Sequence, residues 1–330
     1  MQTTELGHTG TQISRLALGA MQMGNATSEP DSIHILNRYL EIGGSFLDTA
    51  DCYEWWATPG SRGGESEELL GRWLRAGNHR DEVFLATKGS ALPVHSPELW
   101  AADGTPDWDR ARRTFAGGGA TVLRDALDGS LRRLGTDHVD LYYIHVDDRV
   151  TPLEETLETL AGFVRAGKVR HLGWSNVYTW RLERIRRLCS RHGWPLPVAV
   201  QQQHSYLRPN GSYVSVSNAE QLDYLAEHGD QTLVAYSPIL KGIYDDPAKR
   251  AGHSAMSAYA GPDSDARLAA LTSLAGDLGV TPNQLVLAWM MHQDAPTAIP
   301  LIGPRTIEQF EAAVPALDLK LTPEQLELLS

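Results

Sequence analysis

The sequence predicts a (β/α)8 TIM barrel, and three observations support this fold class. Short runs rich in β-branched and aromatic residues alternate with amphipathic segments along the 330-residue chain. The short runs are apolar almost throughout, which is typical of parallel strands buried on both faces. Eight such strand–helix units fit this length better as a closed barrel than as an open sheet. We expect a single domain over residues 1–330, because no linker, low-complexity tract or repeat interrupts the alternation.

The expected elements follow one another in this order. The strands are Leu16–Gly19, Ser45–Thr49, Val83–Thr87, Val139–Ile144, Val169–Trp174, Val198–Gln202, Thr232–Tyr236 and Ala298–Ile302. The helices are Asp31–Ile42, Glu65–Arg75, Ala120–Leu134, Pro152–Ala166, Thr179–Arg191, Ala219–His228, Ser264–Leu278, Pro282–His292 and Ile307–Ala316.

The segments outside this alternation are expected at the two ends of the barrel. Thr3–Ser14 has glycines at turn positions, which predicts a small β-hairpin at the barrel bottom. Three connections are unusually long: Tyr53–Gly64, Ser90–Gly119 and Ser237–Asp263. Because each of them follows a strand, we expect long loops on the face where barrels place their active sites.

Composition excludes several classes of function. The formal net charge of −12 argues against nucleic-acid binding, which depends on Lys and Arg neutralising phosphates. No apolar run is long enough to span a membrane, and the N-terminus lacks an apolar signal region. The two cysteines, Cys52 and Cys189, are far apart and have no metal-site spacing, so no metal site is expected. We expect a cytoplasmic protein without structural disulfides; the sequence does not indicate its oligomeric state.

Four polar residues lie at or just after the ends of three consecutive strands. They are Asp48, Tyr53, Lys88 and His145. Asp48 and Lys88 could pair with each other, because an unpaired buried charge costs several kcal/mol. A nearby lysine ammonium favours the phenolate form of a tyrosine and lowers its pKa. A histidine beside the phenol can orient and polarise a carbonyl oxygen. The group therefore suits protonation of an oxyanion that forms while hydride arrives at carbon.

Each of these residues also has an ordinary structural interpretation when taken alone. Asp48 could be a strand-end cap, Tyr53 a loop aromatic, Lys88 half of a structural ion pair and His145 a hydrogen-bonded buried histidine. Their joint placement at one barrel mouth favours the catalytic interpretation.

Several motifs resemble the aldo-keto reductase family and occur in that family's order. GGSFLDTADCY resembles its strand-two signature, and GGESEELLGRWL keeps part of another signature, with Ser66 and Glu67. SLRRLGTDHVDLYYIHVDD resembles the segment that delivers the histidine, and GKVRHLGWSN, VAVQQQHSYL, LVAYSPILKG and IPLIGPRTIEQ resemble the cofactor segments. The resemblance covers nearly the whole chain. It implies NADPH-dependent reduction of an aldehyde or ketone by direct hydride transfer, with the four residues as a catalytic tetrad and Tyr53 as general acid.

The resemblance also implies a cofactor site along the ends of the later strands. Ser175, Asn176 and Gln201 would bind the nicotinamide carboxamide, and Tyr236 would stack on the ring. The other residues expected to line the cofactor are Gly19, Ala20, Met21, Asp48, Ser237, Pro238, Ile239, Lys241, Gly242, Ile302, Gly303, Arg305 and Gln309.

The segment after the last strand bears on the choice of cofactor. Arg305 offers a planar fork for a 2′-phosphate, so we expect NADPH rather than NADH. Where many relatives carry Glu-Asn, this chain has Ala312 and Ala313, so two polar contacts to the adenosine should be missing. Cofactor binding should therefore be weaker, or a mobile loop should supply another contact.

The substrate is expected to be a small-molecule carbonyl compound bound among aromatic side chains. The expected pocket residues are Trp55, Trp56, Trp174, His204 and Tyr206. The loop Ser90–Gly119 is interpreted either as a lid or as a segment packed on the surface. An aromatic mouth favours a bulky or ring-containing carbonyl. Two alternatives stay open: an NADPH-binding regulatory or sensor subunit with little turnover, and a reductase of a nucleotide-linked keto-sugar.

Overall fold

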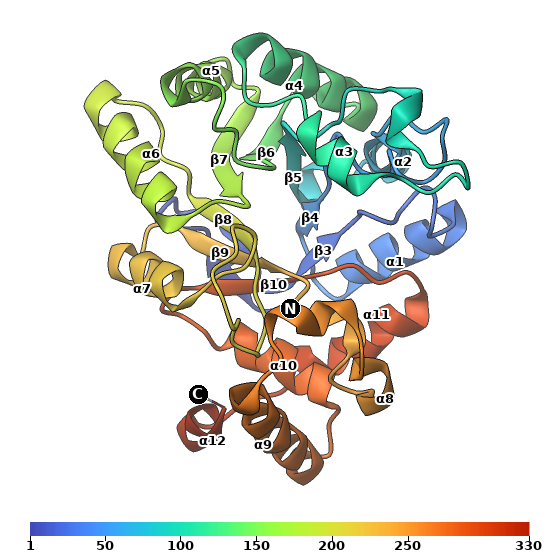
Figure 1. The fold of residues 1–330 in the computed structure, drawn as a ribbon, viewed down its shortest axis with the longest axis vertical. Helices are drawn as coiled ribbons and strands as arrows, with labels where there is room; N and C mark the ends of the chain where they lie inside the picture. The colour runs from blue at the N-terminus through green and yellow to red at the C-terminus, as the bar shows by residue number, and fades with distance from the viewer. Residues whose placement is uncertain (330) are drawn as a thin grey trace.

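The computed structural model describes residues 1–329 and shows eight parallel strands closed into a barrel (Figure 1). In barrel order these strands are β10 (Ala298–Ile302), β3 (Ala17–Gly19), β4 (Phe46–Asp48), β5 (Phe84–Gly89), β6 (Val139–Ile144), β7 (Val169–Ser175), β8 (Ala199–Gln203) and β9 (Thr232–Tyr236). The predicted (β/α)8 fold class is confirmed. The predicted bounds of β6, β9 and β10 match to the residue, and the other strands differ from their predicted bounds by one or two residues at either end.

Helices surround the barrel. They are α1 (Glu29–Glu41), α2 (Glu65–Gly77), α4 (Ala120–Leu134), α5 (Leu153–Arg165), α6 (Thr179–His192), α7 (Ala219–His228), α10 (Pro282–Met291) and α11 (Ile307–Ala313). α9 (Pro262–Leu278) and α12 (Pro323–Leu328) lie away from the strands in Figure 1. None of the helices in residues 1–329 combines the length and apolar character that crossing a bilayer would require.

Local sequence explains where these helices begin and end. Thr281 and Gln284 form a reciprocal capping box at the start of α10. α4 ends where Gly135 takes φ +67°, a left-handed conformation that favours glycine. The predicted helix Ile307–Ala316 instead stops at Ala313 and continues as a 3₁₀ turn over Val314–Leu317. Pro315 has no backbone N–H to donate, so the α-helical hydrogen-bond pattern cannot continue there.

The strand side chains alternate between the barrel interior and the helical layer. In β5, Phe84 and Ala86 belong to the interior cluster, whereas Leu85 packs with the helices. The same alternation directs Lys88 inward. In β4, Phe46 points inward, and so does Asp48 two residues later. This pleat explains how charged residues on two strands reach the barrel axis.

The N-terminal hairpin, β1 (Thr3–Glu5) and β2 (Gln12–Ser14), closes the bottom of the barrel as predicted. Leu6 and Ile13 are fully buried in the interior cluster. The backbone N–H of Gly7 donates to Oγ1 of Thr232, at the start of β9, at 2.8 Å. The interior is therefore closed at this end, and its accessible side is the C-terminal end of the strands.

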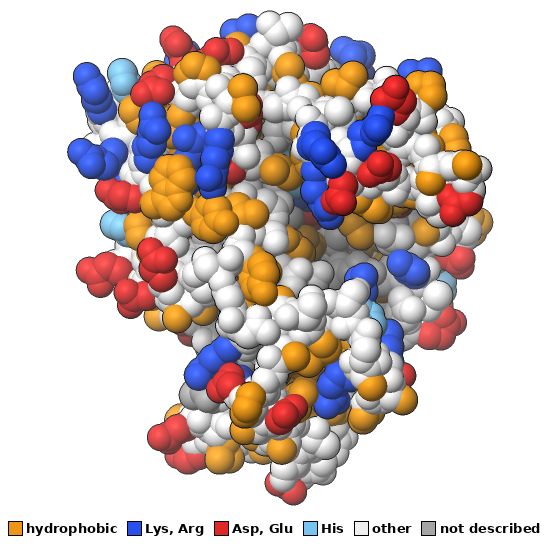
Figure 2. All heavy atoms as spheres, viewed as in Figure 1, with side chains coloured by type: hydrophobic (Ala, Val, Ile, Leu, Met, Phe, Trp, Pro, Cys, Tyr) orange, Lys and Arg blue, Asp and Glu red, His pale blue; other side chains and the backbone are white. Residues whose placement is uncertain are grey.

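The long connections lie at that C-terminal end and contain short helices. Ser90–Gly119 holds α3 (Trp108–Arg113), and Ser237–Asp263 holds α8 (Pro247–Arg250). Neither helix was predicted from the sequence, because four to six residues are too few to show a helical period. Figure 2 shows a hollow over the region where Figure 1 draws the strands, bordered by hydrophobic side chains and by Lys and Arg.

Candidate active site

The structure brings Asp48, Lys88 and Tyr53 into direct contact. Nζ of Lys88 forms an ion pair with Oδ1 of Asp48 and donates to the hydroxyl of Tyr53 at 2.7 Å. It also donates to the carbonyl oxygen of Thr49 at 2.9 Å. Nε2 of Gln201 donates to the second oxygen of Asp48 at 2.8 Å. Every polar atom of the ion pair therefore has a partner, which offsets the cost of burying both charges.

Burial determines the protonation of the Tyr53 phenol. Both members of the ion pair are fully buried, and Tyr53 is 8% exposed. Burial raises the pKa of Tyr53 well above its usual value, and the Asp48 carboxylate raises it further. The lowered pKa that the nearby Lys88 ammonium predicted for Tyr53 is therefore not found, because burial of the phenol raises this pKa instead. Tyr53 is consequently protonated at neutral pH and can act as a proton donor.

His145 completes the group from the end of β6. Its ring lies edge-on to that of Tyr53, with centroids 5.6 Å apart and an interplanar angle of 82°. Burial, followed by the Lys88 charge, lowers the pKa of His145 well below its usual value, so the imidazole is neutral. Its Nδ1 lies 3.4 Å from Sγ of Cys52. A neutral imidazole beside a protonated phenol is able to hydrogen-bond an uncharged carbonyl oxygen.

The residues predicted to hold a nicotinamide form one hydrogen-bonded set beside this group. Nδ2 of Asn176 donates to the carbonyl oxygen of His145 at 2.8 Å and to Oγ of Ser175 at 3.1 Å. The Tyr236 hydroxyl donates to Oδ1 of Asn176 at 2.9 Å. Asn176 takes φ +51°, a conformation that asparagine adopts more readily than most residues. The polar groups at the ends of β7 and β9 are therefore joined to each other and to the backbone of His145.

The other residues predicted to line the cofactor lie at or after the ends of β9, β10 and β3. Five of them lie on the connection that follows β9: Ser237, Pro238, Ile239, Lys241 and Gly242. Ser237 and Lys241 have positive φ values of 53° and 62°. Gly19 pairs with Asp48 across β3 and β4, which places Ala20 and Met21 at the same mouth. Pro238 accepts a hydrogen bond from Ser205 through its carbonyl oxygen. The 3₁₀ turn Leu240–Gly242 follows Ile239 directly.

The end of β10 presents an open surface with a cation. A Cβ added at Gly303 would meet only the carbonyl oxygen of Gly19, at 3.8 Å, so packing within the chain does not require glycine there. Arg305 is exposed, and within residues 1–329 its guanidinium forms no hydrogen bond or ion pair. Gln309 is engaged, since its Oε1 accepts from the backbone N–H of Arg305 at 2.8 Å. Open backbone with a nearby guanidinium fits the phosphates of a nicotinamide dinucleotide.

Three of the five predicted substrate-pocket residues lie elsewhere. Trp174 belongs to the layer between barrel and helices, because side chains alternate along β7 and Gly173 faces Tyr143 inside the barrel. Its indole N–H donates to Oδ1 of Asp147 at 3.3 Å. His204 stacks on Trp289 of α10, at 6.1 Å between ring centroids. The prediction for Trp174 and His204 was therefore wrong.

Tyr206 was also wrongly predicted. It is 1% exposed and packs with α9, where the Arg267 guanidinium carbon lies 4.2 Å from its ring centroid. Its hydroxyl donates to the carbonyl oxygen of Arg267 at 3.2 Å. The chain after β8 turns away from the barrel mouth toward α9 and α10, which hydrophobicity alone does not reveal.

Trp55 and Trp56 belong to a tryptophan cluster beside the tetrad. The cluster consists of Trp55, Trp56, Trp100 and Trp108. Its ring centroids lie 5.1 to 6.1 Å apart along four contacts. Trp55 is buried at its centre, whereas Trp56 is partly exposed and contacts the ring of Tyr53 at 6.2 Å. The cluster joins the Tyr53–Gly64 and Ser90–Gly119 connections into one apolar wall.

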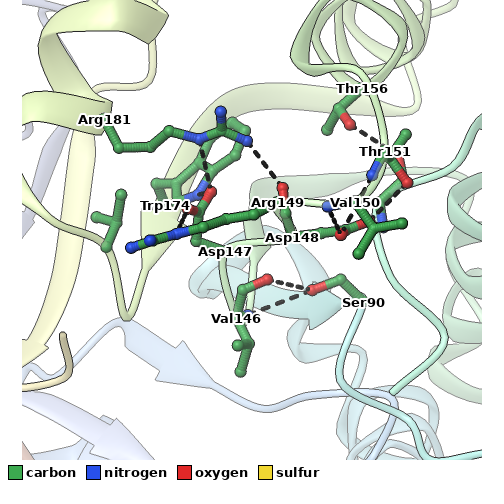
Figure 3. A network of polar contacts seen from close by, with 12 residues as sticks. Ser90, Val146, Asp147, Asp148, Arg149, Val150, Thr151, Thr156, Trp174 and Arg181 are labelled. Atoms are coloured by element: carbon green, nitrogen blue, oxygen red, sulfur yellow. Dashed lines mark hydrogen bonds and ion pairs between the residues drawn. The ribbon is translucent and has the colours of Figure 1, made fainter. Parts of the chain in front are cut away.

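A polar network holds the segment after His145 in place (Figure 3). Oδ1 of Asp147 accepts from Nε of Arg181 at 3.1 Å, and Oγ of Ser90 donates to the carbonyl oxygen of Val146 at 3.1 Å. Asp148 accepts from the backbone N–H of Val150 at 2.7 Å. The segment SLRRLGTDHVDLYYIHVDD contains both aspartates. Their hydrogen-bond partners lie on β7, α6 and the Ser90–Gly119 connection, and the spacing of residues in the sequence did not predict them.

Two buried carboxyls near Tyr53 were also missed. Glu54 has φ +72°, is 1% exposed, and leaves Oε1 without a hydrogen bond. Burial, followed by repulsion from Glu65, raises the pKa of Glu54 to about 7. Asp51 is 3% exposed, and burial followed by Glu67 raises its pKa to about 8. Both groups follow a strand end, but only the folded structure reveals that Oδ1 of Asp51 and Oε1 of Glu54 are buried without hydrogen bonds.

Asp51 should make the stability of the protein decrease as pH rises. The folded state holds this proton more tightly than the unfolded state, so the stabilising contribution is complete below pH ~4 and is lost as pH rises toward ~8. Asp51→Asn keeps the shape of the protonated carboxyl. Its free energy of unfolding relative to that of the wild type should increase by roughly 3–4 kcal/mol from pH 5 to pH 8. Urea unfolding at both pH values measures this difference. If the difference in unfolding free energy between the variant and the wild type were the same at pH 5 and pH 8, Asp51 would have an ordinary pKa.

Comparison with known proteins agrees with this geometry. The model of the aldo/keto reductase family matches residues 15–330. The uncharacterized oxidoreductase YrpG of Bacillus subtilis is 32% identical over 100% of this chain and 95% of its own length. The versiconal hemiacetal acetate reductase of Aspergillus parasiticus is 28% identical, with 100% and 96% covered.

A solved structure shares the fold over its whole length. The thermostable aldo-keto reductase Tm1743, crystallised with the inhibitor epalrestat, aligns with a TM-score of 0.70 and 25% identity, covering 100% of this chain and 98% of that one. Together with the family match, this similarity accounts for the closed barrel and for the order of the motifs along it. The chain belongs to the aldo/keto reductase family of oxidoreductases.

Proposed function

We propose that this oxidoreductase reduces an aldehyde or ketone to an alcohol with NADPH, and that Tyr53 is its general acid. The observation that carries the proposal is the Lys88 ammonium, which contacts both the Asp48 carboxylate and the Tyr53 hydroxyl. Bound NADPH would supply the hydride. Ser175, Asn176, Gln201 and Tyr236 would hold its nicotinamide end.

The proton transfer follows from the contacts of Tyr53. A carbonyl oxygen placed between the phenol and His145 would accept hydrogen bonds from both groups. As negative charge develops on that oxygen, Tyr53 gives up its proton and becomes a phenolate. Lys88, 2.7 Å from the phenol oxygen, stabilises this phenolate, and Asp48 keeps the ammonium in place. The rise in pKa through burial disfavours ionisation in the absence of substrate.

The tryptophan cluster supports a bulky, ring-containing substrate. Trp56 contacts the ring of the proposed acid and is partly exposed, and Trp108 is 40% exposed. Such a surface favours flat apolar groups. We also expect the enzyme to work in the cytoplasm, where the buried thiols of Cys52 and Cys189 would stay reduced.

A substrate panel tests the proposal. Purified protein is mixed with NADPH and with aromatic, aliphatic and sugar-derived aldehydes and ketones, and NADPH consumption is followed. We expect turnover, fastest with aromatic carbonyls. Tight NADPH binding without turnover of any carbonyl would favour a sensor subunit, and turnover restricted to nucleotide-linked keto-sugars would favour the biosynthetic alternative.

Arg305→Ala tests the preference for NADPH. The free guanidinium should pair with the 2′-phosphate, so its loss should weaken NADPH binding by about 10- to 100-fold and NADH binding by less than about 3-fold. Titration of each cofactor, followed by quenching of tryptophan fluorescence, measures both constants. Equal losses for the two cofactors would remove Arg305 from this role.

A further inference from the structure

Cys52 contacts the histidine of the proposed active site directly. Its Sγ lies 3.4 Å from Nδ1 of His145, which is within hydrogen-bond range for sulfur. We propose that Cys52 is a positioning residue whose thiol donates to Nδ1 of His145 and thereby keeps the imidazole proton on Nε2. The inference rests on the proposed function, because it specifies how His145 meets the carbonyl oxygen.

The direction of the hydrogen bond follows from the protonation of both groups. Burial, with a further contribution from Asp51, raises the pKa of the Cys52 thiol well above its usual value, so sulfur carries its proton at neutral pH. The lowered pKa of His145 leaves a neutral ring with one nitrogen free to accept. Lys88 adds to this effect, since its charge opposes protonation of the ring. A thiol facing a neutral imidazole nitrogen can satisfy it as donor.

The surroundings of Cys52 protect this weak bond from competition. The side chain is 4% exposed and packs in a small apolar cluster with Ala50, Ala91 and Leu99. Its backbone carbonyl accepts from the N–H of Trp55 at 3.2 Å, so the loop holds the residue in place. Apart from its own backbone N–H, the residues 1–329 offer the thiol no hydrogen-bond partner other than His145. Water does not compete strongly at such a site.

This hydrogen bond determines whether Nε2 of His145 carries a proton. Among the residues that the structure describes, no donor or acceptor contacts this nitrogen, and the ring is partly exposed. The backbone of His145 is held by Asn176, and the ring lies edge-on to Tyr53. With its proton on Nε2, the ring adds a second donor beside the Tyr53 hydroxyl. With the proton on Nδ1, a lone pair would face the carbonyl oxygen and repel it.

The test combines a direct reading of the tautomer with kinetics. Protein labelled with ¹⁵N-histidine is examined by NMR without ligand, and the His145 signals are assigned by their loss in His145→Asn. We expect the wild type to carry the proton on Nε2, with Nδ1 at the shift of an accepting nitrogen. In Cys52→Ala the Nδ1 signal should move toward that of an unbonded nitrogen, whereas Cys52→Ser, which keeps a donor, should resemble the wild type.

Steady-state kinetics measure how much the tautomer of His145 contributes to turnover. We expect Cys52→Ala to lower kcat by about 5- to 10-fold, as for the loss of one modest hydrogen bond, with the KM for NADPH unchanged. Cys52→Ser should recover to within about 2-fold of the wild type. Cys189→Ala is the matched control, because that buried thiol lies on α6 and contacts the carbonyl oxygen of Pro195. It should change neither the His145 signals nor kcat.

Two results would overturn the assignment of Cys52. One is a wild-type His145 with its proton on Nδ1, and the other is an unchanged Nδ1 signal in Cys52→Ala. Since the tautomer is read without ligand, it is independent of whether the protein reduces any carbonyl. Absent turnover with the expected tautomer would therefore contradict the proposed function and support the contact.

Discussion

Replacing Tyr53 with phenylalanine will lower kcat for carbonyl reduction by about 10²- to 10⁴-fold, the range usual for loss of a positioned general acid. The substitution removes only the hydroxyl that receives the hydrogen bond from Lys88 at 2.7 Å. The ring keeps its contacts with Trp56 and His145, so the shape of the mouth is retained. Steady-state NADPH consumption with the best carbonyl of the panel measures the loss.

Cofactor affinity is the control for this experiment. None of the residues proposed to bind the nicotinamide hydrogen-bonds the Tyr53 hydroxyl, so the Kd for NADPH should change by less than about 3-fold. A variant that keeps more than a tenth of the wild-type kcat would remove Tyr53 from the acid role. Loss of turnover together with loss of NADPH binding would show a disturbed site, and Tyr53→His would then test whether another proton donor restores activity.

Replacing Lys88 with methionine will cost about 3–5 kcal/mol of stability, because it leaves the Asp48 carboxylate buried without its counter-charge. Gln201 still donates to Asp48, but one neutral amide cannot replace an ammonium. The unfolding free energy is obtained from urea denaturation at pH 7. Turnover should also disappear, since the phenolate of Tyr53 loses its stabilising cation.

The double variant Asp48→Asn/Lys88→Met separates the two contributions to this loss. With both charges removed, most of the stability should return, because the main destabilisation in the single variant comes from burying a charge without its partner. Turnover should stay absent, since the ammonium is still missing. Equal instability of the single and double variants would indicate that Lys88 contributes through packing and not through its charge.

The sequence was sufficient to predict the barrel, and it placed charged residues at the ends of its strands for a clear physical reason. Buried parallel strands read as continuous apolar runs, so a charged residue at the end of such a run stands out, as Asp48 and Lys88 do. Alternation along a strand then decides which side chains face inward. In β7, Ser175 was expected to face the cofactor. Its neighbour Trp174 must then face the opposite side, so the same rule would have excluded Trp174 from the substrate pocket.

The environment of loop residues could not be predicted in this way. Trp56 and Trp108 are 52 positions apart in sequence and meet only because two connections fold together. His204 and Tyr206 lie one and three residues past β8, yet they pack against α10 and α9. Cys52 carries no motif signal of its own, and its contact with His145 depends on where β4 and β6 end.

The path of the hydride tests the central claim most directly. NADPH deuterated at the transferring position of nicotinamide C4 is used with the best carbonyl substrate, and the alcohol is analysed by NMR and mass spectrometry. Direct delivery at the mouth bounded by Tyr53 and His145 predicts one deuterium on the carbinol carbon of each product molecule. Product without deuterium at that carbon, or deuterium that appears there only when the solvent is D₂O, would contradict direct hydride transfer in this barrel.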